Sequence, residues 1–173
     1  MTGGRGTPGY TAPELWMLLP VTHKCDVYSF GMLLFDIIGR RRNHDTKLSE
    51  SQEWFPMFAW KKLDAGQMGE LIITCGIEEK YKEIVERMVN VALLCVQCRP
   101  ESRPMMSVVL KMLEGSVDIP KPLNPFQQYM EGNFSFDNIT NTSASSDMVP
   151  DFSIVCATPI MRNYDIELAS TKG

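Results

Sequence analysis

Residues 4–9 of this 173-residue chain read Gly-Arg-Gly-Thr-Pro-Gly and satisfy the spacing G-x-G-x-x-G of a phosphate-binding loop. That chemistry needs a strand leading into the loop and a helix opening at its last glycine, because the phosphate rests on amide groups of the helix N-terminus. Only Met1 to Gly3 stand before these residues, and Tyr10 to Pro13 after them indicate a turn. We therefore interpret the motif as a turn-rich segment and not as a nucleotide site.

The cysteines offer a second candidate chemistry. Their number is odd and they stand in apolar segments, which favours reduced thiols in a cytosolic setting. Cys95 and Cys98 form a C-x-x-C, but a structural zinc site needs four ligands, and no second C-x-x-C or H-x-x-x-H follows. We therefore expect no metal site and no bound cofactor in this chain. The five cysteines are Cys25, Cys75, Cys95, Cys98 and Cys156.

The composition is that of an ordinary soluble domain, with 44% hydrophobic and 22% charged residues and a net charge of -4. This charge gives no reason to expect nucleic acid or an anionic membrane as a partner. A membrane span needs roughly 18 consecutive apolar residues, and the best apolar run, Met32 to Ile38, is short and contains Asp36. We expect no membrane insertion.

Charge divides the chain near residue 116. The residues up to Gly115 hold 14 basic and 14 acidic side chains, whereas the remainder holds 3 basic and 7 acidic ones. This remainder opens with Pro120, Pro122 and Pro125 and continues with many Ser, Thr and Asn residues, a composition typical of an extended linker followed by disorder. We predict a folded domain over residues 1–118 and a flexible tail over residues 119–173.

The most apolar element that the sequence predicts is a helix over residues 24–42. It is apolar almost all round, so we expect it in the middle of the domain. Gly39 suits a left-handed cap at its end, and Arg40 to Arg42 then form a solvated helix end near the negative pole of the helix dipole.

Three further helices follow from apolar spacing. Residues 55–63 hold an aromatic cluster that we expect in the core. Residues 78–96 place one apolar stripe inward and pair Glu78 with Lys82 and Glu83 with Arg87 outside. Residues 104–114 begin at a proline and stop at Gly115. The stripe of the 78–96 helix consists of Ile84, Met88, Val91 and Cys95. The block is therefore mainly α.

Three ordered motifs carry a family resemblance. Ala12-Pro13-Glu14 matches the A-P-E that closes the activation segment of protein kinases. "DVYSFGMLLFDIIGR" at residues 26–40 resembles the central helix of the kinase large lobe, and "ALLCVQCRPESRPMMSVVLKMLEG" at residues 92–115 resembles its closing helices. Over about residues 1–120 the chain resembles the end of a serine/threonine kinase domain, most closely plant receptor-like kinases of the leaf-rust-resistance type. The resemblance implies a kinase-like large lobe from the end of the activation segment onward.

The resemblance also implies roles for single residues. Thr7 matches the threonine that bonds the catalytic aspartate and helps to seat the substrate hydroxyl. Gly9 and Tyr10 match the loop that shapes the pocket for the residue after the phosphoacceptor. Glu14 and Arg103 match two residues that form a structural ion pair across the lobe.

Asp26 matches the aspartate that anchors the central helix by accepting N–H bonds from the catalytic loop. An acid at a helix start also stabilises the helix locally, so the position has a second explanation. Tyr28 stands where many kinases carry Trp, and both residues bring a ring with a polar tip.

The parent family uses ATP and Mg²⁺, but the groups that bind them precede A-P-E in family order. Neither H-R-D-x-x-x-x-N nor D-F-G occurs in the 173 residues. We therefore expect the chain alone to be catalytically inactive. Three interpretations stay open: a truncated piece of an active enzyme, a non-catalytic interaction module that competes with full-length kinases, and a decaying gene whose product does not fold.

The expected partners are a protein substrate or another kinase, on the cytosolic face of the plasma membrane in a full-length parent. In the tail, N-x-[ST] triplets begin at Asn133, Asn138 and Asn141, which chance explains in so Asn- and Ser-rich a segment. Phosphorylation of Ser143, Ser145 or Ser146 is an open alternative role for the tail.

Overall fold

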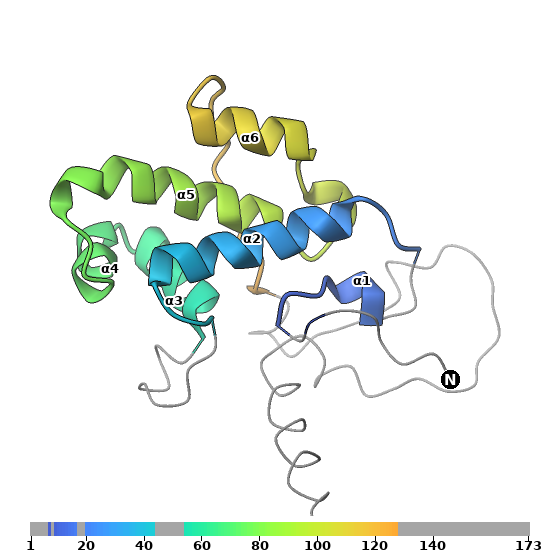
Figure 1. Cartoon of the computed structure of the whole chain (residues 1–173), viewed down its shortest axis with the longest axis horizontal. Coiled ribbons are helices and arrows are strands. Elements are labelled where there is room, and N and C mark those ends of the chain that lie inside the picture. The colour runs from blue at the N-terminus through green and yellow to red at the C-terminus, as the bar shows by residue number, and fades with distance from the viewer. Residues whose placement is uncertain (1–6, 8, 17–19, 44–53, 128–173) are drawn as a thin grey trace, which may run out of the picture. The chain divides into compact units, whose positions relative to one another are not determined.

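The structure is a computed structural model that describes residues 7, 9–16, 20–43 and 54–127. All regular elements formed by these residues are helical (Figure 1). They belong to one compact unit that ends at Pro125. Several predictions concern residues outside the described ranges: the tail beyond Gln127, most of the glycine-rich residues 4–9, Asn133, Asn138, Asn141, Ser143, Ser145, Ser146 and Cys156.

Six α-helices and two 3₁₀ turns make up the described part. The helices are α1 (Pro13–Trp16), α2 (Lys24–Gly39), α3 (Phe55–Asp64), α4 (Met68–Thr74), α5 (Lys82–Cys95) and α6 (Met106–Glu114), and the turns are η1 (Glu79–Tyr81) and η2 (Pro100–Ser102). Helix α5 contacts α2, α3, α4 and α6, and α2 lies alongside it (Figure 1). No helix in these ranges combines the length and the apolar character that a bilayer crossing demands.

Helix α2 differs from its prediction in length and in exposure. It ends at Gly39, and the left-handed conformation falls on Arg40, with φ 53°, and not on the glycine. Glycine at position 39 instead favours close packing, because a Cβ there would lie 3.2 Å from the ring of the buried Phe55. Leu33 and Ile37 are exposed, so the expectation of a helix buried on all sides is wrong. The helix with most neighbours is α5.

Helix α5 begins at Lys82, after the 3₁₀ turn η1, and not at residue 78. Its buried residues include Val85, Val89 and Ala92, whereas Ile84 is 52% exposed, so the predicted inward stripe was wrong at Ile84. Toward the start of α5 the buried face is offset by one residue from the predicted stripe, so that Val85 is buried and Ile84 is not. The charged side chains pair as Lys80 with Glu78 and Lys82 with Glu79, because η1 replaces the first predicted helical turn.

The aromatic element over residues 55–64 is confirmed as core, since Phe55 and Phe58 are buried and their ring centroids lie 6.2 Å apart. Helix α4 was not predicted, because seven residues are too few to display a helical period. Its apolar residues Met68, Leu71 and Ile72 are nevertheless buried.

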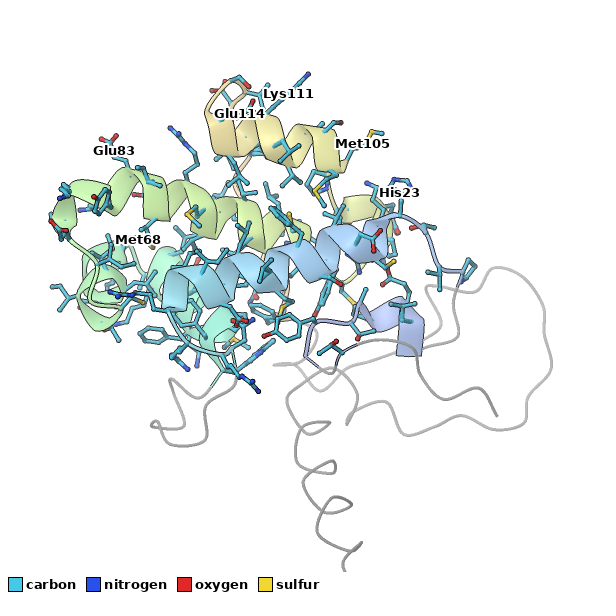
Figure 2. All side chains as sticks on the ribbon, viewed as in Figure 1. His23, Met68, Glu83, Met105, Lys111 and Glu114 are labelled. Atoms are coloured by element: carbon cyan, nitrogen blue, oxygen red, sulfur yellow. The ribbon has the colours of Figure 1, made fainter. Side chains whose placement is uncertain are left out.

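Helix α6 begins at Met106, two residues after the proline at which its start was predicted. Met105 has an extended backbone as the N-cap residue, and its side chain is 57% exposed at the surface (Figure 2). The predicted stop is confirmed, because Gly115 is the C-cap residue with φ 78°. Beyond it, the proline-rich segment forms no helix, yet the Gln97 Nε2 donates to the Leu123 carbonyl at 2.9 Å.

The contact between α2 and α5 depends on Gly31. A Cβ at this position would lie 2.6 Å from the Cβ of Cys95, 2.9 Å from the Cγ1 of Val96 and 3.1 Å from the Ala92 carbonyl oxygen. Real Cβ atoms do not come so close to other atoms, so only glycine permits this approach. The same packing buries the Cys95 thiol and raises its pKa to about 12.

Replacing Gly31 by Ala should lower the free energy of unfolding by about 1–3 kcal/mol, because the new methyl group forces the two helices apart. Urea unfolding followed by circular dichroism measures this loss. Gly69→Ala is the matched control, since no atom lies within 4 Å of a Cβ built there and alanine favours a helix. Equal stability of the Gly31→Ala protein and the native chain would contradict the proposed close contact.

Candidate functional site

The centre of the candidate site is an ion pair between Glu14 in α1 and Arg103 after η2. The Arg103 Nη1 lies 2.6 Å from Oε1 of Glu14, and Nη2 lies 2.9 Å from Oε2, so the two groups meet with two parallel hydrogen bonds. Both residues are about 1% exposed. Such bidentate pairs fix orientation as well as distance. The structure thus brings together two residues that stand 89 positions apart in the sequence.

The remaining N–H groups of Arg103 are all used. Nε donates to the Gln97 carbonyl at 2.7 Å, Nη1 to the Lys24 carbonyl at 3.0 Å and Nη2 to the Cys98 carbonyl at 3.0 Å. A guanidinium has five N–H donors, so the buried cation is fully satisfied. The Tyr28 ring adds a cation–π contact, with its centroid 5.0 Å from the Arg103 Cζ. Tyr28, which stands where many kinases carry Trp, therefore packs against the Arg103 side of the ion pair.

Local structure explains how Arg103 reaches its acceptors. The turn η2 and the extended backbone of Arg103, with φ -81° and ψ 140°, place the side chain beside the carbonyl groups that follow α5. The Lys24 carbonyl belongs to the first residue of α2, and the Lys24 ammonium in turn donates to the Arg103 carbonyl. The start of α2 and the turn before α6 therefore each donate a hydrogen bond to the other.

The segment before Glu14 rests on α2. The Tyr10 N–H donates to the Thr7 carbonyl at 3.1 Å, which closes a turn with Gly9 at φ 85°. The Ser29 hydroxyl donates to the Tyr10 carbonyl at 2.8 Å, and the Tyr10 hydroxyl donates to the Asp36 carboxylate. Ser29 and Asp36 are seven residues apart and share one face of α2. Together they hold Tyr10 at two points.

The bond to Asp36 raises the pKa of Tyr10 to about 12, and burial adds to the shift. The phenol therefore keeps its proton at neutral pH and serves as a donor. The sequence analysis missed Ser29 and Asp36 as contributors to the site. The sequence does mark Asp36 as unusual, because it is the acidic residue within the apolar run Met32 to Ile38.

Two other predicted residues, Thr7 and Asp26, lie at the surface. Thr7 is exposed, and its carbonyl also accepts a hydrogen bond from the Thr11 hydroxyl at 2.8 Å. Asp26 is exposed in the first turn of α2, where the Cys25 thiol lies 3.9 Å from Oδ1. The structure does not bring Asp26 to the ion pair. After Gly9 the next helix is α1, which begins only at Pro13, so no helix opens at the last glycine of the G-x-G-x-x-G motif.

This arrangement is suited to positioning and not to proton transfer. Both carboxylate oxygens of Glu14 are engaged by Arg103, and the Tyr10 hydroxyl is engaged by Asp36. In the part of the chain that the structure describes, no three His, Cys, Asp or Glu side chains gather as metal ligands. What these residues offer is a turn, Thr7 to Tyr10, that is hydrogen-bonded to α2.

Glu14→Gln should lower the free energy of unfolding by about 3–5 kcal/mol, because it leaves the Arg103 charge buried without its counter-charge. Equilibrium urea unfolding is the measurement. Glu70→Gln is the control: the Glu70 side chain pairs with Lys62 but is 58% exposed, and an exposed pair contributes about 0–1 kcal/mol. A Glu14→Gln loss no larger than that of the control would show that the ion pair does not hold the lobe together.

The comparisons with known proteins agree with this geometry. The sequence model of a family described as protein tyrosine and serine/threonine kinase matches residues 2–113. The G-type lectin S-receptor-like serine/threonine-protein kinase SD2-2 of Arabidopsis thaliana is 41% identical over 151 residues, which cover 82% of this chain and 19% of that protein. The rust resistance kinase Lr10 of Triticum aestivum is 38% identical over 130 residues, which cover 73% of this chain and 20% of that protein.

A third relative is the leaf rust 10 disease-resistance locus receptor-like protein kinase-like 2.4 of Arabidopsis thaliana, 44% identical over 119 residues, or 66% of this chain and 19% of the relative. The chain thus spans about a fifth of the length of these relatives. The matched residues 2–113 include every helix described above, apart from the last residue of α6. The chain therefore belongs to the protein tyrosine and serine/threonine kinase family and carries part of the large lobe of a plant-type receptor-like kinase domain.

Proposed function

We propose that this chain is the substrate-positioning part of a serine/threonine kinase domain, formed by residues 1–118, with residues 119–173 as a separate tail. In this proposal Thr7 helps to seat the substrate hydroxyl, and Gly9 and Tyr10 shape the site for the residue after the phosphoacceptor. The supporting observation is the buried pair of Glu14 and Arg103, because it fixes the end of the segment that carries these three residues.

The reaction of the complete domain would move the γ-phosphoryl group of ATP to a protein hydroxyl, with Mg²⁺ as the metal. It requires a loop over the phosphates, a strand lysine and catalytic-loop and D-F-G aspartates. The 173 residues contain no H-R-D-x-x-x-x-N and no D-F-G sequence. The described residues do not fit a Mg-ATP site, since the Glu14 carboxylate is bound to Arg103 and Asp26 is exposed in the first turn of α2. We propose that this chain contributes orientation of a protein substrate, on the cytosolic side of the membrane.

The 173-residue chain alone should transfer no phosphate. The test incubates the purified chain with γ-labelled ATP, Mg²⁺ and casein, and counts label in the protein, beside a buffer control and a complete receptor-like kinase domain. We expect incorporation equal to the buffer control, because the groups that act on the phosphoryl are not among these residues. Incorporation above that control would contradict the proposal that this chain positions a substrate but does not itself transfer phosphate.

A second candidate function is a non-catalytic interaction module that competes for the partners of complete kinases. One observation favours it: the ion pair and both bonds to Tyr10 are completed by residues of this chain alone. The turn Thr7 to Tyr10 can thus be presented to a partner protein by these residues without a second lobe.

Competition in trans tests this second function. Adding the chain to a complete receptor-like kinase and its protein substrate should lower the initial rate of phosphorylation as the chain concentration rises. The Glu14→Gln chain should lower the rate less, because its substrate-facing segment is no longer fixed, while Glu70→Gln should act like the native chain. An unchanged rate at every concentration would exclude the module, and aggregation without a cooperative melt would support the non-folding alternative.

A further inference from the structure

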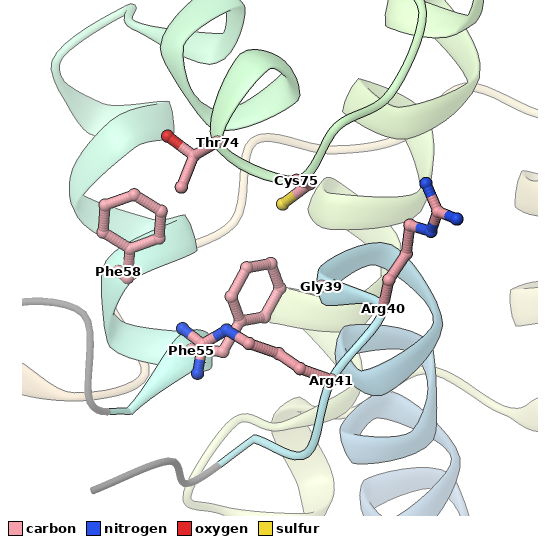
Figure 3. Close-up of a pocket in the computed structure, with 7 residues that line it drawn as sticks. All are labelled: Gly39, Arg40, Arg41, Phe55, Phe58, Thr74 and Cys75. Atoms are coloured by element: carbon pink, nitrogen blue, oxygen red, sulfur yellow. The ribbon is translucent and has the colours of Figure 1, made fainter. Parts of the chain in front are cut away.

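A pocket of about 420 Å³ lies between the ends of α2 and α4 and the start of α3 (Figure 3). Its aromatic lining consists of Phe55 and Phe58, which are 1% and 6% exposed and belong to the core. The Arg41 side chain covers the Phe55 ring, with 5.2 Å between the guanidinium carbon and the ring centroid. The pocket therefore presents no open ring face to a ligand.

A different feature follows α6. Residues 119–125, the first residues of the predicted tail, form an extended segment (orange in Figure 1) that contains three prolines. Ile119 is half-buried, and Pro122 and Pro125 are buried. These side chains stand three positions apart, which is the period of a polyproline II helix. We call residues 119–125 the proline strap.

One side chain of the lobe holds the proline strap. Gln97, which follows α5 and is 9% exposed, donates through Nε2 to the Leu123 carbonyl at 2.9 Å and to the Leu93 carbonyl at 3.0 Å. Both N–H groups of this amide are therefore used, one on the strap and one on α5. The backbone carbonyl of Gln97 in turn accepts a hydrogen bond from the Arg103 Nε at 2.7 Å. The strap is thus fastened to a residue that the buried arginine also holds.

The strap contributes little to its own stability. Proline has no N–H group, so three of its seven residues cannot donate a backbone hydrogen bond. A polyproline II segment also has no internal hydrogen bonds. Its closed position depends on the burial of Pro122 and Pro125 and on the Gln97 amide. Segments with so few buried contacts open at a lower free energy than the whole fold.

We propose that the proline strap is a latch that opens separately from the lobe. In the closed state Pro122 and Pro125 are buried and Gln97 binds the Leu123 carbonyl. In the open state the strap leaves the surface while the helices stay folded, and the Gln97 amide exchanges the Leu123 carbonyl for water. Opening lengthens the free chain after α6 by seven residues, so that the latch sets the reach of the tail.

Chymotrypsin cleavage after Leu123 in the full 173-residue chain measures the opening, and mass spectrometry identifies the fragment that ends there. The Leu123 side chain is 77% exposed. A protease must nevertheless draw the chain on both sides of the bond into its cleft, so the strap has to detach first. A synthetic peptide of residues 117–127, digested under the same conditions, gives the rate for the undocked sequence.

We expect cleavage of the chain at least about tenfold more slowly than cleavage of the peptide, because the open state is a minor population. Urea below the unfolding range should accelerate it only weakly relative to the peptide, since local opening exposes little surface. Cleavage as fast as that of the peptide would overturn the proposal. A urea dependence equal to that of global unfolding would also overturn it, because the strap would then open only together with the lobe.

Pro122→Ser should raise the cleavage rate of the chain by about tenfold, because it removes a buried ring from the docked face of the strap. Pro120→Ser is the matched control, since it relaxes the backbone of the same segment at an exposed position. Equal acceleration by the two changes would show that stiffness of the segment slows the cleavage, and would contradict docking.

Gln97→Met keeps the length of the side chain but removes both amide donors, and it should raise the cleavage rate by about fivefold. Gln67→Met makes the same change at an exposed glutamine that accepts a hydrogen bond from Lys62, and it should leave the rate unchanged. No acceleration by Gln97→Met would contradict fastening by this residue. The outcome is independent of the proposed kinase role, because neither ATP nor a protein substrate takes part.

Discussion

The buried contact of Glu14 with Arg103 is the constraint on which the rest of this lobe depends. It joins the two ends of the helical part, and the guanidinium also bonds the carbonyl groups at the start of α2 and after α5. A buried ion pair is not a strong source of net stability, since removing two charges from water offsets most of their attraction. Its value here is geometric, because the N–H donors of Arg103 bond groups of α1, of α2 and of the segment after α5, and so hold these elements together.

The position of the turn Thr7 to Tyr10 depends on this ion pair. Glu14 fixes one end of the segment, and Ser29 and Asp36 fix Tyr10 from one face of α2. Helix α2 is in turn fixed by its close contact with α5 at Gly31, where no side chain would fit. The turn is therefore held through a series of packed elements that ends at α5.

Much of this arrangement was predictable from the sequence. Apolar spacing predicted the helical class and four of the helices, and the motifs at residues 12–14, 26–40 and 92–115 predicted the family. Apolar spacing did not predict the features that depend on tertiary contacts. The left-handed residue is Arg40 whereas Gly39 packs against Phe55, Ile84 is exposed where the adjacent Val85 is buried, and the bond of Tyr10 to Asp36 joins residues that no local pattern connects. Helix α4 is too short to carry a period.

The contact between α2 and α5 also buries a thiol, Cys95, whose reactivity can report on separation of the two helices. The Cys95 sulfur is sealed at that crossing with a pKa of about 12, so it has almost no thiolate at neutral pH and no path for a reagent. Cys25, Cys75 and Cys98 are only partly covered. Alkylation of Cys95 can therefore proceed only when the two helices separate, and its rate counts the opening events of the native lobe.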